Sequence, residues 1–465
     1  MIDWNTQSSL LALTHLDGRN SHKISSLRPF FSEYAWIKAR LGVMCAYLVR
    51  MYRFGPDRPG MPEEDEKKIL AIAETFGLKE AESVQKFEKT VNHDVKAIEL
   101  YLASELEARS LSVYSVSINL GIGSEDINSI ALSSLLQKSR DEVFIPILRE
   151  VIGSLCSLAD REKNTRFAAR THAQPANITT FGKEIANTVL RLCDEFPIFS
   201  SLALSAKCSG EVGSLQGHFT VSAHFDWLTF LDDFVKSFGL IPAHGATQIA
   251  PYERIVSYLQ SVFRLNTILL DLSKNMWLFV LLGFLTVKKK DEEVGSAGMP
   301  HKVNPIYYEG AEGGFVMANG IIEIFCRALP INRLSRDFSD STIRRNLVLP
   351  LAYSLLSYQS ILEGLSRTAV DRDAMKRDME AHEEIFIETI KAFGLTHGIA
   401  GMFDILKTKT RGRILSRLDV LELIRELPLS ERQKSELTDL LSTSNPYPSS
   451  LVDEACRLGK KVISI

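Results

Sequence analysis

The sequence predicts an all-α protein whose central part is a bundle of long helices. Apolar residues recur three and four positions apart over long segments, as they do on the buried face of an α-helix. Alternating patterns typical of β-strands are scarce. No period repeats along the chain, which disfavours a helical repeat array. The segments with the clearest helical periodicity are residues 127–159, 181–192, 252–285, 303–328 and 343–365.

Several of these segments carry apolar residues on more than one side, so we expect helices that also pack on neighbouring subunits. Composition changes near residues 108–113 and again near 366–373, where shorter, charged helices begin. We therefore expect three helical domains. They are an N-terminal domain (1–110), a central long-helix domain with the motif-bearing loop (111–366) and a C-terminal domain (367–465).

The composition is that of a globular protein, with 45% apolar and 24% charged residues in a chain of 465. A net charge of −3 gives no support for nucleic-acid or anionic-membrane binding, so an anionic substrate needs local basic groups. The N-terminus lacks the pattern of a secretory signal. The longest apolar run, residues 276–287, is shorter than the roughly 20 residues that cross a bilayer. We expect a cytoplasmic protein.

The six cysteines are scattered, with neither a Cys-x-x-Cys pair nor a zinc-binding spacing. Reduced thiols, buried in most cases, are the expected state. No metal site is predicted. The cysteines are Cys45, Cys156, Cys193, Cys208, Cys326 and Cys456.

The segment 295–304 (Gly-Ser-Ala-Gly-Met-Pro-His-Lys-Val-Asn) is the most informative polar stretch. It is neither a phosphate-binding Gly-x-x-x-x-Gly-Lys loop nor a nucleophile elbow. It combines the hydroxyl of Ser296 with a cation, Lys302, and an amide donor, Asn304. Such groups can remove a proton beside a carboxylate and stabilise the dianion that results.

Three further polar segments interrupt the apolar helices. Asn92-His93-Asp94 is predicted to lie inside an amphipathic helix. Ser124 is a candidate N-cap with acids in the following turn, and the third segment is residues 170–175 around His172. Each has a simpler explanation. A helical histidine such as His93 is most often solvated or hydrogen-bonded, and Ser124 can be a plain cap. The segment around His172 has many donors and acceptors and little apolar surface to pack.

A fourth segment, residues 333–345, holds four arginines together with serines just before a helix. Surface exposure explains isolated arginines. The clustering favours recognition of a phosphate or carboxylate. The arginines are Arg333, Arg336, Arg344 and Arg345.

Taken together, these segments resemble the signatures of a known family. Gly295-Ser296-x-x-Met299-x-x-Lys302-x-Asn304 is similar to the signature of the aspartase/fumarase superfamily at every defined position. The string 299–305 resembles the adenylosuccinate lyase family in particular. Other marks of that family recur in order across nearly the whole chain, at residues 16–19, 92–96, 124–128, 170–175, 247–249 and 336–341.

The resemblance implies an all-helical fold assembled as a homotetramer with a 20-helix core and active sites shared between three subunits. It implies β-elimination of fumarate from adenylosuccinate, a step of purine nucleotide biosynthesis that yields AMP. It also implies the same elimination from the succinylated aminoimidazole carboxamide ribotide, a second nucleotide substrate. No metal or organic cofactor is implied.

Residue by residue, the resemblance implies that Ser296 is the base and that His172 is the acid, with Glu309 paired to the histidine. Lys302 and Asn304 would hold the succinyl carboxylates, with Ser124 and Gln248 as further donors. His93 would lie near the substrate and its phosphate. The phosphate and ribose would be held by Arg19, Arg336, Ser341 and Arg345, and the motif neighbours Asn92, Asp94 and Thr171 complete the predicted substrate-binding set.

Five positions depart from the family pattern, and four of them replace polar or glycine residues of substrate loops: Asn20, Gly123, Ala173, Glu211 and Ala297. An acidic Glu211 near an anionic substrate is unfavourable unless it points away. The chemistry is therefore expected to be retained, while the substrate is open to change. Two alternatives stand beside the first prediction. One is a divergent lyase that releases fumarate from another N-substituted aspartate, and the other is a structural protein without activity.

Overall fold

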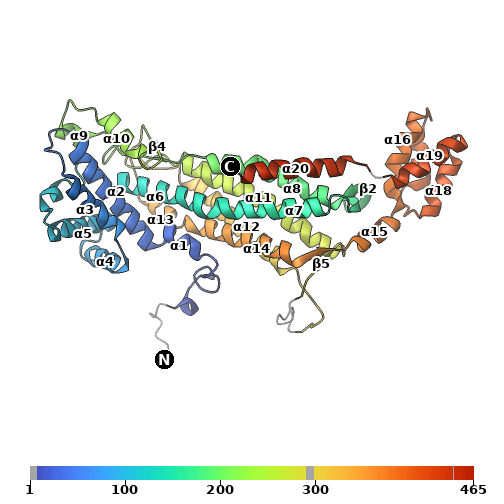
Figure 1. Cartoon of the computed structure of the whole chain (residues 1–465), viewed down its shortest axis with the longest axis horizontal. Helices are drawn as coiled ribbons and strands as arrows, with labels where there is room; N and C mark the ends of the chain where they lie inside the picture. The colour runs from blue at the N-terminus through green and yellow to red at the C-terminus, as the bar shows by residue number, and fades with distance from the viewer. Residues whose placement is uncertain (1–7, 290–297, 444, 465) are drawn as a thin grey trace. The chain divides into compact units, whose positions relative to one another are not determined.

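The computed structural model describes residues 8–289, 298–443 and 445–464, and helices dominate it, which confirms the predicted all-α class (Figure 1). The chain divides into two compact units. Unit 1 comprises Met1–Ile147, Ile198–Asn266 and Gly314–Leu356, and unit 2 comprises Leu148–Pro197, Thr267–Gly313 and Ser357–Ile465. No helix in the described part of the chain has both the length and the apolar character that a membrane crossing requires.

The division between the units falls within five long helices, so each unit contains part of every one of them. They match the predicted periodic segments closely. They are α7 (Ile145–Arg161), α8 (Phe181–Ser201), α11 (Glu253–Leu281), α12 (Ile306–Ala328) and α14 (Val348–Arg367).

The segment 127–159 contains two helices rather than one. Helix α6 (Ser124–Ser139) is followed by a π-helical turn, Arg140–Phe144, which leads into α7. Buried Arg140 donates to the backbone carbonyl of Leu202 and pairs with Asp141 at 2.7 Å. The apolar spacing alone does not reveal this turn, because the repeat continues on both sides of it.

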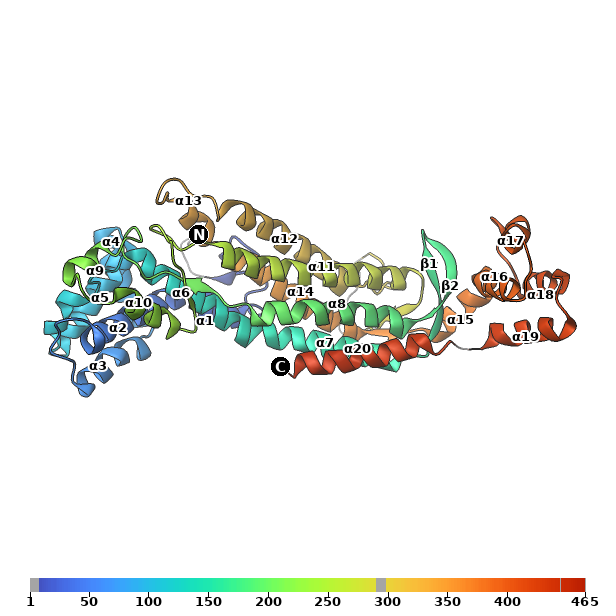
Figure 2. The same cartoon turned by 90° about the horizontal axis from the view of Figure 1, so that it is seen from above.

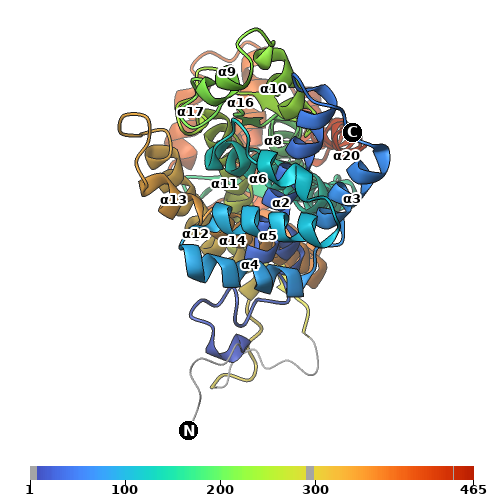
Figure 3. The same ribbon diagram turned by 90° about the vertical axis from the view of Figure 1, so that its left-hand side faces the viewer.

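Unit 1 is built around α2 (Glu33–Phe54), which packs against α3, α5 and α6 (Figure 3). The Ser32 hydroxyl caps this helix by accepting from the amide of Ala35 at 3.2 Å. Its middle is fully buried at Met44, Tyr47 and Leu48. The remaining helices and strands of this unit are α1 (Arg28–Phe31), α3 (Glu63–Glu74), α4 (Leu78–Val91), α5 (Asp94–Ala108), α9 (Gln216–Val221), α10 (Trp227–Lys236), α13 (Ser339–Arg344), β3 (Ser205–Ala206) and β4 (Ile241–Pro242).

The prediction that Asn92-His93-Asp94 lies inside a helix is wrong, because Asn92 and His93 separate α4 from α5 and Asp94 is the first residue of α5. Asn92 has the left-handed conformation, with φ of 50°, and ends α4. His93 begins α5 as its N-cap, with Nδ1 accepting from the amide of Lys96 at 3.2 Å. An asparagine adopts the left-handed region more readily than most residues, which makes it a good helix stop.

Unit 2 contains a long antiparallel hairpin, β1 (Arg166–Thr171) and β2 (Gln174–Thr180), seen beside α15 in Figure 2. Helix α20 packs on α7, since the Cys456 thiol donates to the carbonyl of Cys156 at 3.4 Å. All six cysteines are free, and five of them are buried. The other elements of this unit are β5 (Leu285–Val287), β6 (Thr368–Val370), α15 (Arg372–Glu380), α16 (Ile387–Thr396), α17 (Met402–Thr410), α18 (Arg417–Glu426), α19 (Glu431–Ser442) and α20 (Tyr447–Ile463).

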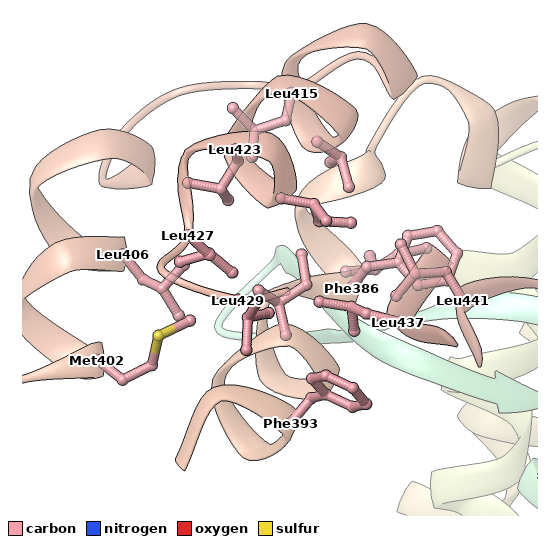
Figure 4. Close-up of a cluster of buried hydrophobic side chains, with 14 of the residues drawn as sticks. Phe386, Phe393, Met402, Leu406, Leu415, Leu423, Leu427, Leu429, Leu437 and Leu441 are labelled. Atoms are coloured by element: carbon pink, nitrogen blue, oxygen red, sulfur yellow. The ribbon is translucent and has the colours of Figure 1, made fainter. Parts of the chain in front are cut away.

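Helices α16 to α19 form an apolar cluster of their own. Phe386, Phe393, Leu423 and Leu437 meet there (Figure 4). Ala168 from the hairpin belongs to the same cluster. Because each side chain is removed from water, the cluster stabilises this group of short helices, none of which is long enough to be stable alone.

Leu437→Ala should lower the free energy of unfolding of unit 2 by roughly 2–5 kcal/mol, because Leu437 is 0% exposed and its removal leaves a cavity. Leu418→Ala is the matched control on α18, where the side chain is 77% exposed, and it should change stability by less than about 0.5 kcal/mol. Denaturant unfolding followed by circular dichroism measures both. Equal losses in the two variants would contradict this packing.

Candidate active site

The amino end of α6 supplies the first element of the site. Gly123 is the N-cap and Ser124 is the first helical residue, so the predicted cap is displaced by one position. The cap is completed by the Asp126 carboxylate, which accepts from the amide of Gly123 at 2.8 Å. With no capping task, the half-buried Ser124 hydroxyl is available at a helix N-terminus, where anions are favoured.

A buried ion pair holds this helix end against two loops. Lys207 Nζ lies 3.1 Å from the Asp126 carboxylate, and both side chains are almost fully buried. The carboxylate also accepts from the amides of Ser209 and Gly210, while Lys207 donates to the carbonyl of Gln248 at 2.9 Å. The loops that carry Ser209 and Gln248 are thus fixed relative to Ser124.

Next along α6, the carboxylate of Glu125 is shared by two arginines. Arg344 binds it with both nitrogens at 2.7 and 3.2 Å, and Arg336 approaches to 3.0 Å. Burial opposes ionisation of this carboxyl group, but the hydrogen bonds and charges of the arginines outweigh it and lower the pKa of Glu125. The acid therefore stays ionised and orients both guanidinium groups.

Arg336 brings two other predicted residues together. It donates to the Ser341 hydroxyl at 2.8 Å and to the side-chain oxygen of Gln248 at 3.3 Å. It also lies 3.5 Å from Asp340, which accepts from the Tyr252 hydroxyl. Arg336, Ser341, Gln248 and Ser124 thus gather around the end of α6, and we call these four residues the anchoring cluster.

Asp94 and Arg345, two further predicted residues, lie 3.7 Å apart. Asp94 also binds the buried Arg40 at 2.7 Å. Burial would raise the pKa of Asp94, but the charge and hydrogen bond of Arg40, with help from Arg345, lower it. Arg345 remains 67% exposed, so it can reach a ligand.

A cavity of ≈ 160 Å³ opens beside these groups. Asp94, Arg344 and Arg345 line its polar side, while Phe30 and Trp36 line its apolar side. A concave pocket with a few polar groups against aromatic walls is typical of a small-molecule site. The cavity therefore extends the candidate site from the end of α6 toward Arg345.

Of the predicted residues in unit 1, Asn92 and Arg19 lie outside these contacts, and His93 approaches only Asp94, with its Nδ1 3.8 Å from the carboxylate. Asn92 and His93 are exposed at the break between α4 and α5, where His93 is used as a helix cap. Arg19 is exposed in a turn-rich segment, and its side chain makes no hydrogen bond or ion pair within the described residues. Their roles stay predictions.

In unit 2, His172 lies at the tip of the β1–β2 hairpin. Thr171 pairs with Gln174, so the turn consists of His172 and Ala173 alone. Both have positive φ, 53° and 62°, as a type I′ turn requires. Neither is glycine, and each therefore costs roughly 1 kcal/mol in this region. The pairing of β1 and β2 imposes this strained turn, and the exposed imidazole of His172 lies at the tip of the hairpin.

The other predicted groups of unit 2 follow the segment 290–297, which includes Ser296 and Ala297 and lies outside the described residues. Lys302 is exposed, and its amide closes a turn on the carbonyl of Met299 at 3.1 Å. Glu309, in the first turn of α12, accepts from the Trp277 indole at 3.0 Å. No hydrogen bond joins Glu309 to His172 among the described residues, so their pairing stays a prediction.

Glu211 points toward the end of α6 rather than away from it. A β-carbon on Gly123 would lie 2.8–2.9 Å from the carboxylate atoms of Glu211, so a side chain at position 123 would require this exposed carboxylate to move. The two departures from the family pattern are therefore neighbours in the structure. They also place an exposed acid beside Ser124, where a substrate carboxylate is predicted to bind.

Two residues of the site, Glu125 and Lys207, were not predicted to act there. Glu125 lies inside a motif, but its contacts are made with distant residues. Arg344 was predicted only as a member of the arginine cluster, and the structure shows that its side chain, 9% exposed, is paired with Glu125. Lys207 belongs to no motif, and its role depends on burial.

Among the described residues, no group of three or more His, Cys, Asp or Glu side chains is placed to hold a metal ion.

Comparison with known proteins shows which family the chain resembles. The Lyase family model matches residues 18–320, and the model described as adenylosuccinate lyase C-terminal matches residues 332–445. Adenylosuccinate lyase of Escherichia coli strain K12 is 34% identical over 92% of this chain and 95% of its own. The Haemophilus influenzae adenylosuccinate lyase is 32% identical over 98% and 99%.

Solved structures share the fold. A fumarate lyase from Mesorhizobium sp. BNC1 superposes with a TM-score of 0.72 at 18% identity, covering 95% of this chain and 97% of its own. The β-carboxy-cis,cis-muconate cycloisomerase of Acinetobacter calcoaceticus gives 0.73 at 14% identity, over 93% and 97%. The fold and the first family model define a lyase of the aspartase/fumarase superfamily. Within it, the full-length relatives and the C-terminal model show that the chain belongs to the adenylosuccinate lyase family.

Asp126→Asn should lower the free energy of unfolding by roughly 3–5 kcal/mol, because it leaves the buried Lys207 ammonium without its counter-charge. The control is Glu63→Gln, which breaks an exposed pair with Lys67 and should cost less than about 1 kcal/mol. Chemical denaturation of both variants is the measurement. A loss for Asp126→Asn as small as that of the control would contradict the bracing role of the pair.

Proposed function

We propose that the protein is an adenylosuccinate lyase, which eliminates fumarate from adenylosuccinate to leave AMP. It would perform the same elimination on the succinylated aminoimidazole carboxamide ribotide. The observation that carries the proposal is the anchoring cluster. In it Arg336 is held by Glu125 while donating to Ser341 and Gln248. The cluster lies beside a helix N-terminus and is suited to a phosphorylated or carboxylated substrate.

The elimination needs one base and one acid. Ser296 would remove a proton from the carbon beside a carboxylate. The electron pair of the broken carbon–hydrogen bond would form the new double bond of fumarate. The carbon–nitrogen bond would break at the same time, with His172 delivering a proton to the departing nitrogen. A serine acts as a base only where nearby donors stabilise its alkoxide. The exposed position of His172 at the tip of the β1–β2 hairpin supports this role.

The developing negative charge must be offset by fixed donors. Lys302 and Asn304 would hold the succinyl carboxylates, with Ser124 and Gln248 as further donors. Arg19, Arg336, Ser341 and Arg345 would hold the phosphate and ribose, with His93 nearby. Glu309 would pair with His172 of another chain and keep the imidazole oriented.

Each complete site would take its groups from several chains of a homotetramer. Helices α11 and α12 support association, because they expose large apolar side chains that one chain leaves uncovered. These include Leu278, Leu281, Val316, Met317 and Ile324. A cytoplasmic enzyme of purine biosynthesis is the corresponding cellular role. Three helical domains, 1–110, 111–366 and 367–465, remain our proposed division of the chain.

The carboxylate of Glu211 supports one alternative. An acid beside Ser124 repels a substrate carboxylate at that place. A lyase that releases fumarate from another N-substituted aspartate, with different surroundings at this end of α6, is therefore the second candidate function.

Incubation of the purified protein with adenylosuccinate should release fumarate and AMP, followed by ultraviolet absorbance. Ser296→Ala and His172→Ala should each reduce kcat by at least about 100-fold, because each removes a proton-transfer group. The folded state, checked by circular dichroism, should be unchanged.

The substrate control is a panel of other N-substituted aspartates. Fumarate from one of those, with none from adenylosuccinate, would favour the alternative. Full activity in either variant would overturn the assigned roles. No turnover of any substrate would reject both lyase proposals.

A further inference from the structure

Unit 2 contains a second polar cavity, far larger than the one beside Arg345 and unrelated to the predicted catalytic residues. It measures ≈ 480 Å³ and lies between the base of the β1–β2 hairpin, the start of α16, the end of α19 and the start of α20. This volume is in the range of small-molecule sites.

The chemistry of its lining is that of an anion site. Lys163 and Arg166 contribute cations, Asn164 and Asn445 contribute amides, and Thr179, Thr180 and Thr389 contribute hydroxyl groups. The hydroxyls of Thr443 and Ser449 also line the cavity, but they already donate to the backbone carbonyls of Asp439 and Pro446. None of the described residues that line the cavity is acidic. One wall is apolar, formed by Phe386 and Leu440 with neighbouring side chains.

The two cations are not equivalent. Lys163 is neutralised by Asp160 and Asp453, each 3.1 Å away. The half-buried Arg166 guanidinium makes no hydrogen bond or ion pair with the described residues. Another acid, Glu388, contacts a residue that lines the cavity, because its carboxylate accepts from the side-chain amide of Asn177. Because this Arg166 guanidinium has no acceptor among the described residues, it is available to bind an anionic ligand.

We propose that this cavity is a second ligand site, which binds a small organic phosphate monoester through Arg166. A phosphate offers several acceptor oxygens, which suits one arginine fork surrounded by hydroxyl and amide donors. The apolar wall at Phe386 suits an organic group attached to that phosphate. The volume is much larger than inorganic phosphate would need.

The position of the cavity links ligand binding to the hairpin that carries His172. Arg166 and Thr180 pair at the base of the same hairpin whose tip carries His172. A ligand held at the base would stabilise both strands and thereby the arm that presents the imidazole. This consequence rests on the proposed function, whereas binding itself does not.

Hydrogen exchange of the full-length protein with phenyl phosphate tests the binding site. Peptides that cover residues 163–180 and 440–450 should gain protection. Arg166→Gln should weaken the effect by about 10-fold or more, because a charge-assisted hydrogen bond is lost. Arg166→Lys should retain part of it. Arg432→Gln, an exposed arginine on α19 that does not line the cavity, is the matched control and should bind as the wild type does.

Phenol and inorganic phosphate are the ligand controls, and both should protect these peptides less than phenyl phosphate. Equal protection by phenol, or unchanged binding by Arg166→Gln, would overturn the phosphate site. Protection confined to a peptide covering residues 336–345 would place phenyl phosphate at the anchoring cluster. That result would also overturn the proposed phosphate site at Arg166. The readout does not depend on turnover, so it stands even if adenylosuccinate is not a substrate.

Discussion

The carboxylate of Glu125 is the interaction on which the candidate site depends. It neutralises the buried Arg344 and holds Arg336, which in turn reaches Ser341 and Gln248. The adjacent Asp126 pairs with Lys207, and together they fix the loops that carry Ser209 and Gln248. Two consecutive acids of one helix thus arrange a set of cationic and polar donors before any substrate arrives, and this reduces the reorganisation that binding requires.

The proposed acid is positioned by different means. His172 is exposed and is held by two residues with positive φ at the end of paired strands, not by side-chain partners. Ala173, which stands where the family pattern has glycine, retains this turn at a cost in backbone strain. The anchoring groups and the acid therefore belong to different units of the chain.

Helical periodicity predicted the long helices well, because a buried apolar stripe requires apolar residues three and four positions apart. It predicted their ends less well, since α8 continues to Ser201. It did not predict the break at Asn92, which depends on the left-handed conformation of one residue, or the π-turn at Arg140. Resemblance to family motifs identified Arg336, Ser341 and Gln248, which the structure brings together. Lys207 was missed and Arg344 was given no role of its own, because their importance comes from burial and from partners far away in the sequence. The proximity of Gly123 to Glu211 also required coordinates.

The central claim is that a complete site combines groups of different chains. The most direct test mixes inactive Ser296→Ala and His172→Ala proteins under conditions that exchange subunits. If the base and the acid of one site come from different chains, random mixing should restore about a quarter of wild-type activity, since half of each contributing position is intact. Activity that stays at the level of the separate variants, although mixed oligomers form, would contradict the account.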